Sequence, residues 1–304
     1  MLTFPVQNLF IDGPDCAGKS TLIKKIHDIS RYRWHITDRS QISRSVFNSL
    51  YKRDIPNISF DFYREVSNIN NRFVLLIPDI SVIKSRYDSR GDDIHKDFKS
   101  IKLVHDAFLE KKDLFAGFSN ILFFSEENTD EIASRIASYL SLIERPLLRE
   151  VSDTIIENVS HCMGECYPVE FTLWDDGKFE EASKDCFSYD KEAKYYQNIY
   201  NSLHKKISSE LSGKNQYNRV ETHSSRRFVH TEDTCISFIQ VAVRDNLMDF
   251  NVVMRSADVE TTFPHDLEFL YYLASTCYDR FSSYCNSVRM RFYLNSAHIL
   301  NKII

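Results

Sequence analysis

Four residues near the start of the chain have the types and spacing that bind a phosphate chain. Gly13, Gly18, Lys19 and Ser20 complete the pattern G-x-x-x-x-G-K-S, in which the glycines let backbone N–H groups approach phosphate oxygens. The lysine would reach the outer phosphates of ATP, and the serine hydroxyl would ligate Mg²⁺. Only seven glycines occur in 304 residues, so a chance match in a glycine-rich turn explains the pattern poorly. The other residues expected to contact the nucleotide here are Asp15, Ala17 and Thr21.

The residues around this motif predict a strand before it and an amphipathic helix after it. An apolar strand over residues 9–11 would deliver the loop, and a helix over residues 20–31 would point its positive N-terminal end at the same anion. Strands and helices then alternate, with strands at 34–37, 73–77 and 121–124 and helices at 99–111 and 129–142. This order predicts an α/β domain with a mostly parallel sheet.

Two further groups of polar residues lie where such a domain binds ligands. Asp38 and Arg39 follow the second strand, and open parallel sheets bind ligands at the carboxyl ends of their strands. The carboxylate would take a proton from an acceptor or hold the Mg²⁺ shell, and the arginine would grip an acceptor phosphate. Arg86 and Arg90, one helical turn apart, would converge on a phosphate chain. The plainer interpretation of Asp38 and Arg39 is a surface ion pair. The plainer interpretation of Arg86 and Arg90 is a solvated helix face.

Over about residues 7–144 the chain resembles thymidylate kinase-like and phage-type deoxynucleoside monophosphate kinases. The resemblance rests on the phosphate loop, on a D-R-x-x-x-S element formed by Asp38, Arg39 and Ser43, and on an R-x-x-x-R-G element that begins at Arg86. It implies a P-loop kinase that uses ATP and Mg²⁺, with the D-R-x-x-x-S element on the acceptor side and both arginines of the third element in a mobile lid.

The distance in sequence between the phosphate loop and the D-R-x-x-x-S element leaves the chemical identity of the acceptor open. Asp38 comes only nineteen residues after Lys19, a shorter interval than thymidylate kinases have and similar to that of polynucleotide kinases. The acceptor is therefore either a nucleoside monophosphate or a hydroxyl group.

The second half of the chain carries a different group of chemically capable residues. Arg226, Arg227 and Arg255, with Ser256, are the kind of set that binds one phosphate. Positive charge near Cys235 would favour its thiolate. A buried apolar thiol and structural arginines are the simpler alternative. Alternating apolar residues over 236–243 and 248–254 predict two strands joined by a turn.

In order and spacing, these residues resemble thymidylate synthase and its relative deoxycytidylate hydroxymethylase over roughly residues 148–304. The series runs S-R-R, C, Q, R-S-x-D, P-x-D and A-H. The resemblance implies an α+β domain in which Cys235 adds to C6 of a pyrimidine, and in which Arg226 and Arg227 reach the 5′-phosphate from the partner subunit of a homodimer. It also implies that Asp258 orients the folate or the base, and that His298 bonds the deoxyribose hydroxyl.

Asp266 stands where thymidylate synthases have an asparagine that reads uracil. A carboxylate suits cytosine, because it accepts a hydrogen bond from the amino group, and the hydroxymethylases have aspartate there. We therefore expect this domain to bind dCMP or a modified dCMP in preference to dUMP.

Other positions depart from that resemblance. Leu300 replaces the tyrosine expected two places after the histidine, Thr261, Thr262 and Phe263 replace folate-side residues, and the segment that closes over folate would follow Ile304. Two alternatives therefore stay open beside a kinase fused to a pyrimidine-nucleotide-binding domain. One is a bifunctional enzyme that also transfers a hydroxymethyl group to dCMP from a tetrahydrofolate cofactor. The other is a non-catalytic NTP-binding or dimerisation module.

The composition limits the classes of protein to consider. A net charge of −5 gives no nucleic-acid-binding signature, and neither a run of eighteen apolar residues nor a secretory signal pattern occurs. Seven cysteines without a C-x-x-C pair suggest reduced, mostly buried thiols in the cytoplasm, host cytoplasm if the protein is viral. We expect two domains, residues 1–145 and 146–304, and a reaction on small nucleotides: ATP-dependent phosphorylation of dTMP or of a 5-modified dCMP or dUMP.

Overall fold

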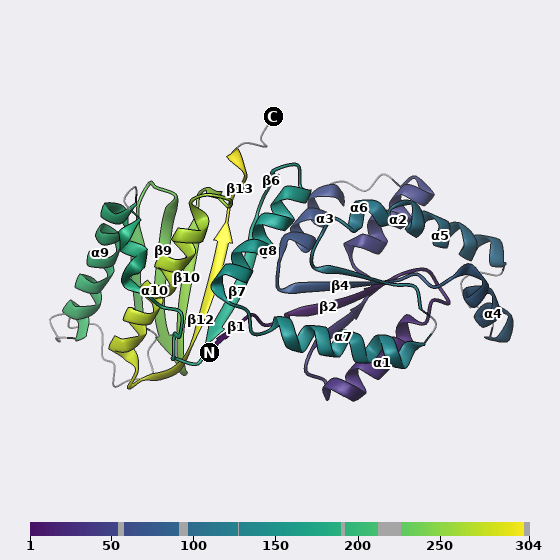
Figure 1. Cartoon of the computed structure of the whole chain (residues 1–304), viewed down its shortest axis with the longest axis horizontal. Helices are drawn as coiled ribbons and strands as arrows, with labels where there is room; N and C mark the ends of the chain where they lie inside the picture. Colours follow the sequence, from purple (N-terminus) through teal and green to yellow (C-terminus); the bar gives the residue numbers. More distant parts are fainter. Residues whose placement is uncertain (54–57, 91–96, 127, 190–191, 212–225, 301–304) are drawn as a thin grey trace. The chain divides into compact units, whose positions relative to one another are not determined.

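The computed structural model describes the chain except for residues 54–57, 91–96, 127, 190–191, 212–225 and 301–304 (Figure 1). The chain divides into two compact units. The N-terminal unit is Val6–Glu144, and the C-terminal unit combines Met1–Pro5 with Arg145–Ile304. The chain passes from the N-terminal unit to the C-terminal unit between Glu144 and Arg145. Leu2 and Thr3 pair with Asp175 and Trp174, which places this first segment in the sheet of the C-terminal unit.

The N-terminal unit is an α/β domain, as its sequence predicts. Its four strands are all parallel, in the order β3-β2-β4-β5, with β2 at Asn8–Asp12, β3 at His35–Asp38, β4 at Asn71–Leu76 and β5 at Ile121–Phe124. Its helices are α1 (Lys19–Ser30), α2 (Gln41–Tyr51), α3 (Ile58–Ser67), α4 (Ile80–Arg90), α5 (Phe98–Glu110), α6 (Lys112–Phe115) and α7 (Thr129–Ile143). In Figure 1, α1 and α7 lie on one side of the sheet, and α2, α3, α5 and α6 lie on the other. Every residue of β4 is buried, which is the pattern expected of a strand covered on both faces.

The core on the α1 side of this sheet fixes the strand and the helix that flank the phosphate loop. Leu9 and Ile11 of β2 and Leu22 and Ile26 of α1 are all 0% exposed, and they pack in one cluster with the apolar face of α7. Burying each such side chain contributes about 1.5–3 kcal/mol. The loop between β2 and α1 is therefore held at both ends by well-packed elements.

The C-terminal unit is an α+β domain. Its large sheet has the order β1-β7-β12-β10-β9-β8, and a small sheet has the order β11-β13-β6. The strands are β1 (Leu2–Thr3), β6 (Glu165–Cys166), β7 (Val169–Asp175), β8 (Arg226–Thr231), β9 (Ile236–Arg244), β10 (Asn246–Met254), β11 (Ala257–Asp258), β12 (Cys285–Leu294) and β13 (Ala297–His298). The helices are α8 (Leu148–His161), the 3₁₀ helix η1 (Lys184–Ser188), α9 (Ala193–Leu211) and α10 (Phe263–Phe281).

Several strands of the large sheet begin or end on the same side of the sheet, next to Cys235. We call this row of strand ends the Cys235 edge. Met254, the last residue of β10, pairs with Ile236 at the start of β9 and with Leu294 at the end of β12. Val169, the first residue of β7, pairs with Leu294 in turn. The segments that carry Cys235, Arg255–Asp258 and the residues after Leu294 therefore leave the sheet at the same edge.

Within the described residues, no helix is long and apolar enough to cross a bilayer. All seven cysteines are free thiols, and all of them except Cys235 are buried.

Candidate functional site

The phosphate loop needs glycine at both motif positions. Gly13 has φ +141°, and a Cβ there would lie 2.2 Å from the carbonyl oxygen of Leu76 on β4. Gly18 has φ +100°, and a Cβ there would lie 3.1 Å from Nη1 of Arg86. Because such φ values strain any residue with a side chain, the loop can pass close to β4 and to Arg86 only with glycine at these positions.

A hollow of about 100 Å³ lies over the loop and the start of α1. Its lining includes six of the predicted residues: Asp15, Gly18, Lys19, Ser20, Thr21 and Asp38. Lys19 is only 6% exposed, and its Nζ donates hydrogen bonds to the carbonyl oxygens of Gly13 and Pro14, at 3.0 and 2.9 Å. Burial lowers the pKa of Lys19, while the carboxylates of Asp15 and Asp38 oppose that shift. The hollow thus combines one buried ammonium group with hydroxyl and carboxylate oxygens.

Arg39 is joined to the phosphate loop. Its Nη2 donates a hydrogen bond to Oδ1 of Asp15 at 2.8 Å, and its guanidinium lies 5.3 Å from the ring centroid of Phe47. The side chain remains 41% exposed. The predicted acceptor-side arginine and the predicted loop aspartate therefore form one ion pair beside the hollow.

Arg86 of α4 also contacts the loop, but the structure does not describe its predicted partner. Nη1 of Arg86 donates a hydrogen bond to the carbonyl oxygen of Ala17 at 2.5 Å. Arg90 is the last residue of α4, and its side chain and the following glycine lie outside the described residues. The structure places one of the two predicted lid arginines at the phosphate loop.

Asp12, which sequence reasoning missed, anchors this region. It is the last residue of β2, is 0% exposed, and accepts hydrogen bonds from the backbone N–H and hydroxyl groups of both Ser40 and Ser43. Burial raises the pKa of Asp12, and the four hydrogen bonds oppose that shift. Ser43 is itself 1% exposed, so this predicted nucleotide contact faces Asp12. The sequence does contain a signal that could have identified Asp12: it is a carboxylate at the end of an apolar strand, directly before Gly13.

The residues predicted to hold magnesium fit that ion. Among the described residues, no three His, Cys, Asp or Glu side chains gather into a metal site. Ser20 and Asp38 line one hollow, and Mg²⁺ commonly takes one or two protein oxygens and completes its shell with waters and substrate phosphates. A hydroxyl and a carboxylate beside a phosphate loop match that donor set.

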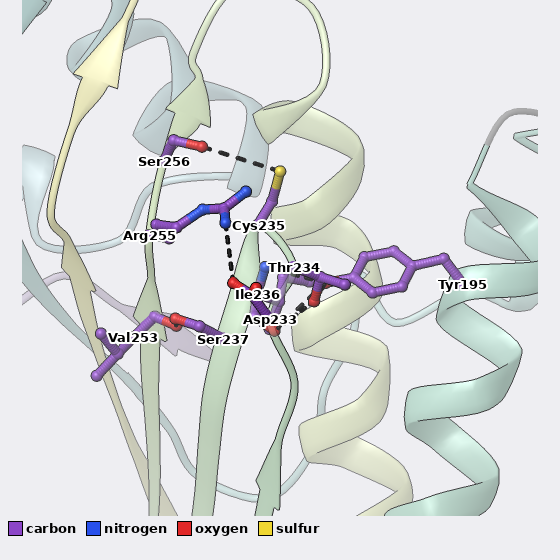
Figure 2. A network of polar contacts seen from close by, with 9 residues as sticks. All are labelled: Tyr195, Asp233, Thr234, Cys235, Ile236, Ser237, Val253, Arg255 and Ser256. Atoms are coloured by element: carbon purple, nitrogen blue, oxygen red, sulfur yellow. Dashed lines mark hydrogen bonds and ion pairs between the residues drawn. The ribbon is translucent and has the colours of Figure 1, made fainter.

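At the Cys235 edge, the predicted nucleophile lies beside two predicted phosphate ligands (Figure 2). Cys235 is exposed, and Oγ of Ser256 lies 3.9 Å from its Sγ. The backbone N–H of Arg255 donates to the carbonyl oxygen of Cys235 at 2.8 Å. The Arg255 guanidinium bonds to Asp233 at 2.9 Å and is 59% exposed. Thiol, hydroxyl and guanidinium therefore lie together on the surface of this edge.

The small sheet brings two further predicted residues together. Asp258 of β11 pairs with His298 of β13, and Nδ1 of His298 lies 3.4 Å from Oγ of Ser296. Asp258 is 8% exposed and accepts hydrogen bonds from the Thr261 hydroxyl and the backbone of Glu260. The Asp258 carboxylate thus stabilises the turn that directly follows it in the chain.

The arginine pair predicted to reach a phosphate is described only by its backbone. Arg226 and Arg227 begin β8 and pair with Val243 and Ala242 of β9, and their side chains lie outside the described residues. Because β9 starts at the Cys235 edge, this pair stands at the opposite end of β9 within its own subunit.

Asp266 lies in the first turn of α10 and is 4% exposed. Its Oδ1 accepts a hydrogen bond from the Tyr196 hydroxyl at 2.8 Å, and burial raises the pKa of Asp266 to about 7. The neighbouring Tyr195 hydroxyl accepts from the backbone N–H of Ile236 at 2.9 Å and contacts Thr234 (Figure 2). Sequence reasoning missed both tyrosines.

Comparison with known proteins gave similarities only at the level of structure. No protein-family model and no curated protein matches the chain. One similar solved structure is deoxyadenosine kinase from M. mycoides with bound dATP, with 16% identity and a TM-score of 0.31 over 44% of this chain and 98% of that chain. Another is thymidylate synthase from T4 phage, with 12% identity and a TM-score of 0.28 over 44% of this chain and 67% of that one. At TM-scores of 0.31 and 0.28, these two matches add nothing to the evidence of the residues themselves.

Proposed function

We propose that the chain transfers the γ-phosphate of ATP to a pyrimidine deoxynucleoside monophosphate, either dTMP or a 5-modified dCMP or dUMP. The observation that supports this most is the hollow over the phosphate loop, where Lys19, Ser20 and Asp38 all line one space. Phosphoryl transfer depends mainly on positioning and on stabilising negative charge. A buried ammonium and the N-terminus of α1 provide both for a triphosphate.

On the donor side, each residue has a defined task. The Lys19 ammonium, now bonded to loop carbonyls, would exchange these neutral acceptors for charged phosphate oxygens, which form stronger hydrogen bonds. Mg²⁺, when bound by Ser20 and Asp38, would neutralise charge on the β- and γ-phosphates. Arg86, held at the Ala17 carbonyl, is close enough to the loop to stabilise charge on the transferred group.

On the acceptor side, Arg39 and Asp15 would hold the monophosphate and its sugar. The ion pair between them is partly exposed, so Arg39 keeps donors available for an acceptor phosphate. A hydroxyl acceptor is the second candidate, supported by the carboxylate of Asp38 in the same hollow as Lys19. In that case Asp38 would take the hydroxyl proton as the general base.

The kinase proposal is tested by assaying ADP formation and the phosphorylated acceptor with a panel of deoxynucleosides and deoxynucleoside monophosphates, including 5-hydroxymethyl forms. A nucleoside would give a monophosphate, and a monophosphate would give a diphosphate. Lys19→Ala should abolish transfer, whereas Lys24→Ala, an exposed lysine on the same helix, should not. Unchanged turnover in Lys19→Ala contradicts the proposal. Turnover of nucleosides alone favours the hydroxyl acceptor, and the absence of ADP formation with every acceptor favours a binding module without catalysis.

We also propose that the C-terminal unit binds a pyrimidine deoxynucleotide at the Cys235 edge. Arg255 and Ser256 would hold the 5′-phosphate beside the thiol of Cys235, and His298 would bond the sugar hydroxyl. A folate-dependent hydroxymethyl transfer to dCMP is the alternative that adds catalysis, with tetrahydrofolate as the one-carbon carrier. Release of tritium from C5 of labelled dCMP with methylene-tetrahydrofolate tests it, and Cys235→Ser should abolish that release. Binding of dCMP without release favours a binding domain.

We further propose that the C-terminal unit forms a homodimer through the outer face of its large sheet. The register places Phe238, Val253 and Tyr293 side by side on three adjacent strands, and all three are partly exposed, while Val252 and Phe292 beside them are buried. A second copy would cover these side chains, and it would bring Arg226 and Arg227 from the partner to the phosphate. Light scattering of the full chain should give twice the monomer mass, and Val253→Arg should restore the monomer.

A further inference from the structure

The residues from Arg39 to Arg53 form a basic stretch in an acidic protein. The whole chain has a net charge of −5, but this stretch contains four Arg or Lys residues and no Asp or Glu. It consists of α2 and the residues that flank it. Because the potential at a surface depends on how charge is distributed, the net charge of the chain does not exclude an anionic ligand at this helix.

Two aromatic rings on α2 lie parallel to each other. Phe47 and Tyr51, one helical turn apart, stack with ring centroids 6.1 Å apart and an interplanar angle of 1°. Phe47 also meets Phe108 of α5 edge to face, and Phe108 is fully buried. Tyr51, in contrast, is 46% exposed. The pair of rings is therefore anchored to the core at Phe47 and reaches solvent at Tyr51.

Each of these rings has a guanidinium group as a neighbour. The guanidinium carbon of Arg39 lies 5.3 Å from the centroid of Phe47, and that of Arg53 lies 5.2 Å from the centroid of Tyr51. We call the set of Arg39, Phe47, Tyr51 and Arg53 the α2 ladder. Arg44 lies on the same stripe of the helix, because it precedes the two rings by three and seven residues.

Two carboxylates contact the basic groups of this surface. Asp15 accepts a hydrogen bond from Arg39 at 2.8 Å, and Asp61 of α3 lies 3.7 Å from Arg44. The arginine side chains of these pairs are 41% and 46% exposed. Ion pairs at such exposed positions contribute little free energy, so a phosphate group can compete for both guanidinium groups.

The combination of rings and guanidinium groups indicates the class of ligand. Unpaired nucleobases stack on aromatic rings and on guanidinium planes, while the phosphates of the same strand pair with Arg and Lys. A duplex hides the faces of its bases, and an acidic peptide would use the charges without the parallel rings. With eleven residues, α2 is about 16 Å long, which matches roughly four stacked nucleotides at about 3.4 Å each.

We propose that the α2 ladder binds single-stranded nucleic acid, with bases stacked along its two rings and phosphates held by Arg44 and Arg53. A base would take the place of the Arg53 guanidinium over the ring of Tyr51 and leave that guanidinium free for a phosphate. Because Arg39 is bonded to Asp15, which lines the hollow, one end of the strand would lie beside the phosphate loop. This site goes beyond the proposed phosphoryl transfer to a mononucleotide.

The test is fluorescence anisotropy of a labelled thymidine oligonucleotide of about ten nucleotides, titrated with the full chain in the absence of ATP. Two matched ligands are a strand of the same length without bases and a duplex of the same length. The single strand should bind more tightly than the strand without bases, by about fivefold or more for each stacked base. It should also bind more tightly than the duplex.

Three variants separate the contribution of the rings from that of the charges. Tyr51→Ala removes an exposed ring and should weaken binding by about fivefold or more. Phe47→Leu keeps an apolar contact with Phe108, removes the aromatic face, and should weaken binding similarly. Arg53→Gln should reduce the slope of log affinity against log salt concentration by about 0.7.

Tyr32→Ala is the matched control for the loss of a ring. Tyr32 is 74% exposed and follows α1, the helix on the other side of the sheet (Figure 1). This variant should bind the single strand as the wild type does. A loss of affinity in Tyr32→Ala equal to that in Tyr51→Ala would show that α2 has no special part in binding.

The remaining outcomes also decide the matter. The proposal is overturned if the wild type does not bind the single strand, or if Tyr51→Ala binds it unchanged. Equal affinity for the strand without bases overturns it in favour of a general polyanion site, and equal affinity for the duplex removes the role of stacking. Since ATP is absent from every titration, none of these results affects the proposed phosphoryl transfer, which the formation of ADP tests separately.

Discussion

The hydroxyl of Ser40 donates a hydrogen bond to Oδ2 of Asp12 at 2.7 Å, joining the N-terminus of α2 to the last residue of β2. Gly13 directly follows Asp12, and Asp38 and Arg39 directly precede Ser40. One buried carboxylate therefore fixes the phosphate loop and the acceptor-side residues relative to each other.

Replacing Asp12 by asparagine should destabilise the N-terminal unit. The amide has one acceptor oxygen in place of two. If its oxygen keeps the three donors at Oδ1, its NH₂ group would face the Ser40 hydroxyl that donates to Oδ2, so a hydrogen bond to a charged group is lost at a cost of about 1–3 kcal/mol. Urea unfolding followed by Trp34 fluorescence in a Trp174→Phe background measures this, since Trp34 is the tryptophan of this unit. Asp61→Asn is the control, because the Asp61 side chain is only partly buried and its Oδ2 lies 3.7 Å from Nη1 of Arg44, and it should change stability by less than about 1 kcal/mol. Equal stability of Asp12→Asn and the wild type would contradict the anchoring role.

Alanine should be tolerated less at Gly13 than at Gly18. Both positions have positive φ, which costs on the order of 1–3 kcal/mol for a residue with a side chain. At Gly13 the new Cβ would also meet the Leu76 carbonyl at 2.2 Å, whereas at Gly18 it would meet the end of the Arg86 side chain at 3.1 Å. Gly13→Ala should unfold the N-terminal unit or displace β4, and Gly18→Ala should fold and bind ATP more weakly. Thermal melting and ATP titration separate the two, and the reverse order of stabilities would show that the loop moves away from β4 easily.

Cys235 should react first with a thiol reagent. It is exposed, while the other six cysteines are buried in the folded chain. Limited alkylation followed by peptide mass spectrometry should label Cys235 alone until the chain unfolds, and dCMP should slow the labelling by covering Sγ. Ser256→Ala is a matched variant, because it removes the hydroxyl that lies 3.9 Å from Sγ of Cys235 and leaves the thiol in place. Early labelling of a second cysteine would mean that the C-terminal unit opens more readily than its packing indicates.

The stability of the C-terminal unit should depend on Asp266 between about pH 4 and pH 7. The pKa of Asp266 is raised from 3.8 to about 7 in the folded chain, so the folded state holds the proton more tightly. Its contribution is complete below about pH 4 and is lost as the pH rises through 7. Relative to Asp266→Asn, the wild type should therefore lose up to about 1.4 kcal/mol of unfolding free energy per pH unit over this interval. Unfolding followed by Trp174 in a Trp34→Phe background measures it, and parallel pH profiles would refute a raised pKa.

The sequence predicted the N-terminal unit better than the C-terminal unit, for physical reasons. In the N-terminal unit, apolar strands and amphipathic helices alternate over short distances, so strands such as β5 at Ile121–Phe124 were located correctly. In the C-terminal unit, α10 is buried on most of its surface, which removes the one-sided pattern that marks a helix. β12 does alternate, with Val288, Met290 and Phe292 buried between polar residues, and its pattern was available but unassigned.

The sequence likewise indicates the residues of the phosphate-loop site better than it indicates the contacts of Asp266. Motif residues of the phosphate loop lie together because they are close in sequence, and most of them line the hollow. The bond between Tyr196 and Asp266 joins residues 70 positions apart, and no local pattern indicates it. Asp12 is an intermediate case. Its place directly before Gly13 can be seen in the sequence, but its hydrogen-bond partners, Ser40 and Ser43, are known only from the fold.

The pairing of β1 with β7 makes the N-terminal unit an insertion within the C-terminal one. The chain leaves the large sheet after Thr3, builds a complete α/β domain, and returns at Arg145. The amino group of Met1 meets Asp176 across 175 positions of sequence. Closing so long a loop is slow and entropically costly, and prior folding of the inserted domain would shorten the effective distance. This connectivity favours folding of the inserted domain before β1 joins the large sheet of its host.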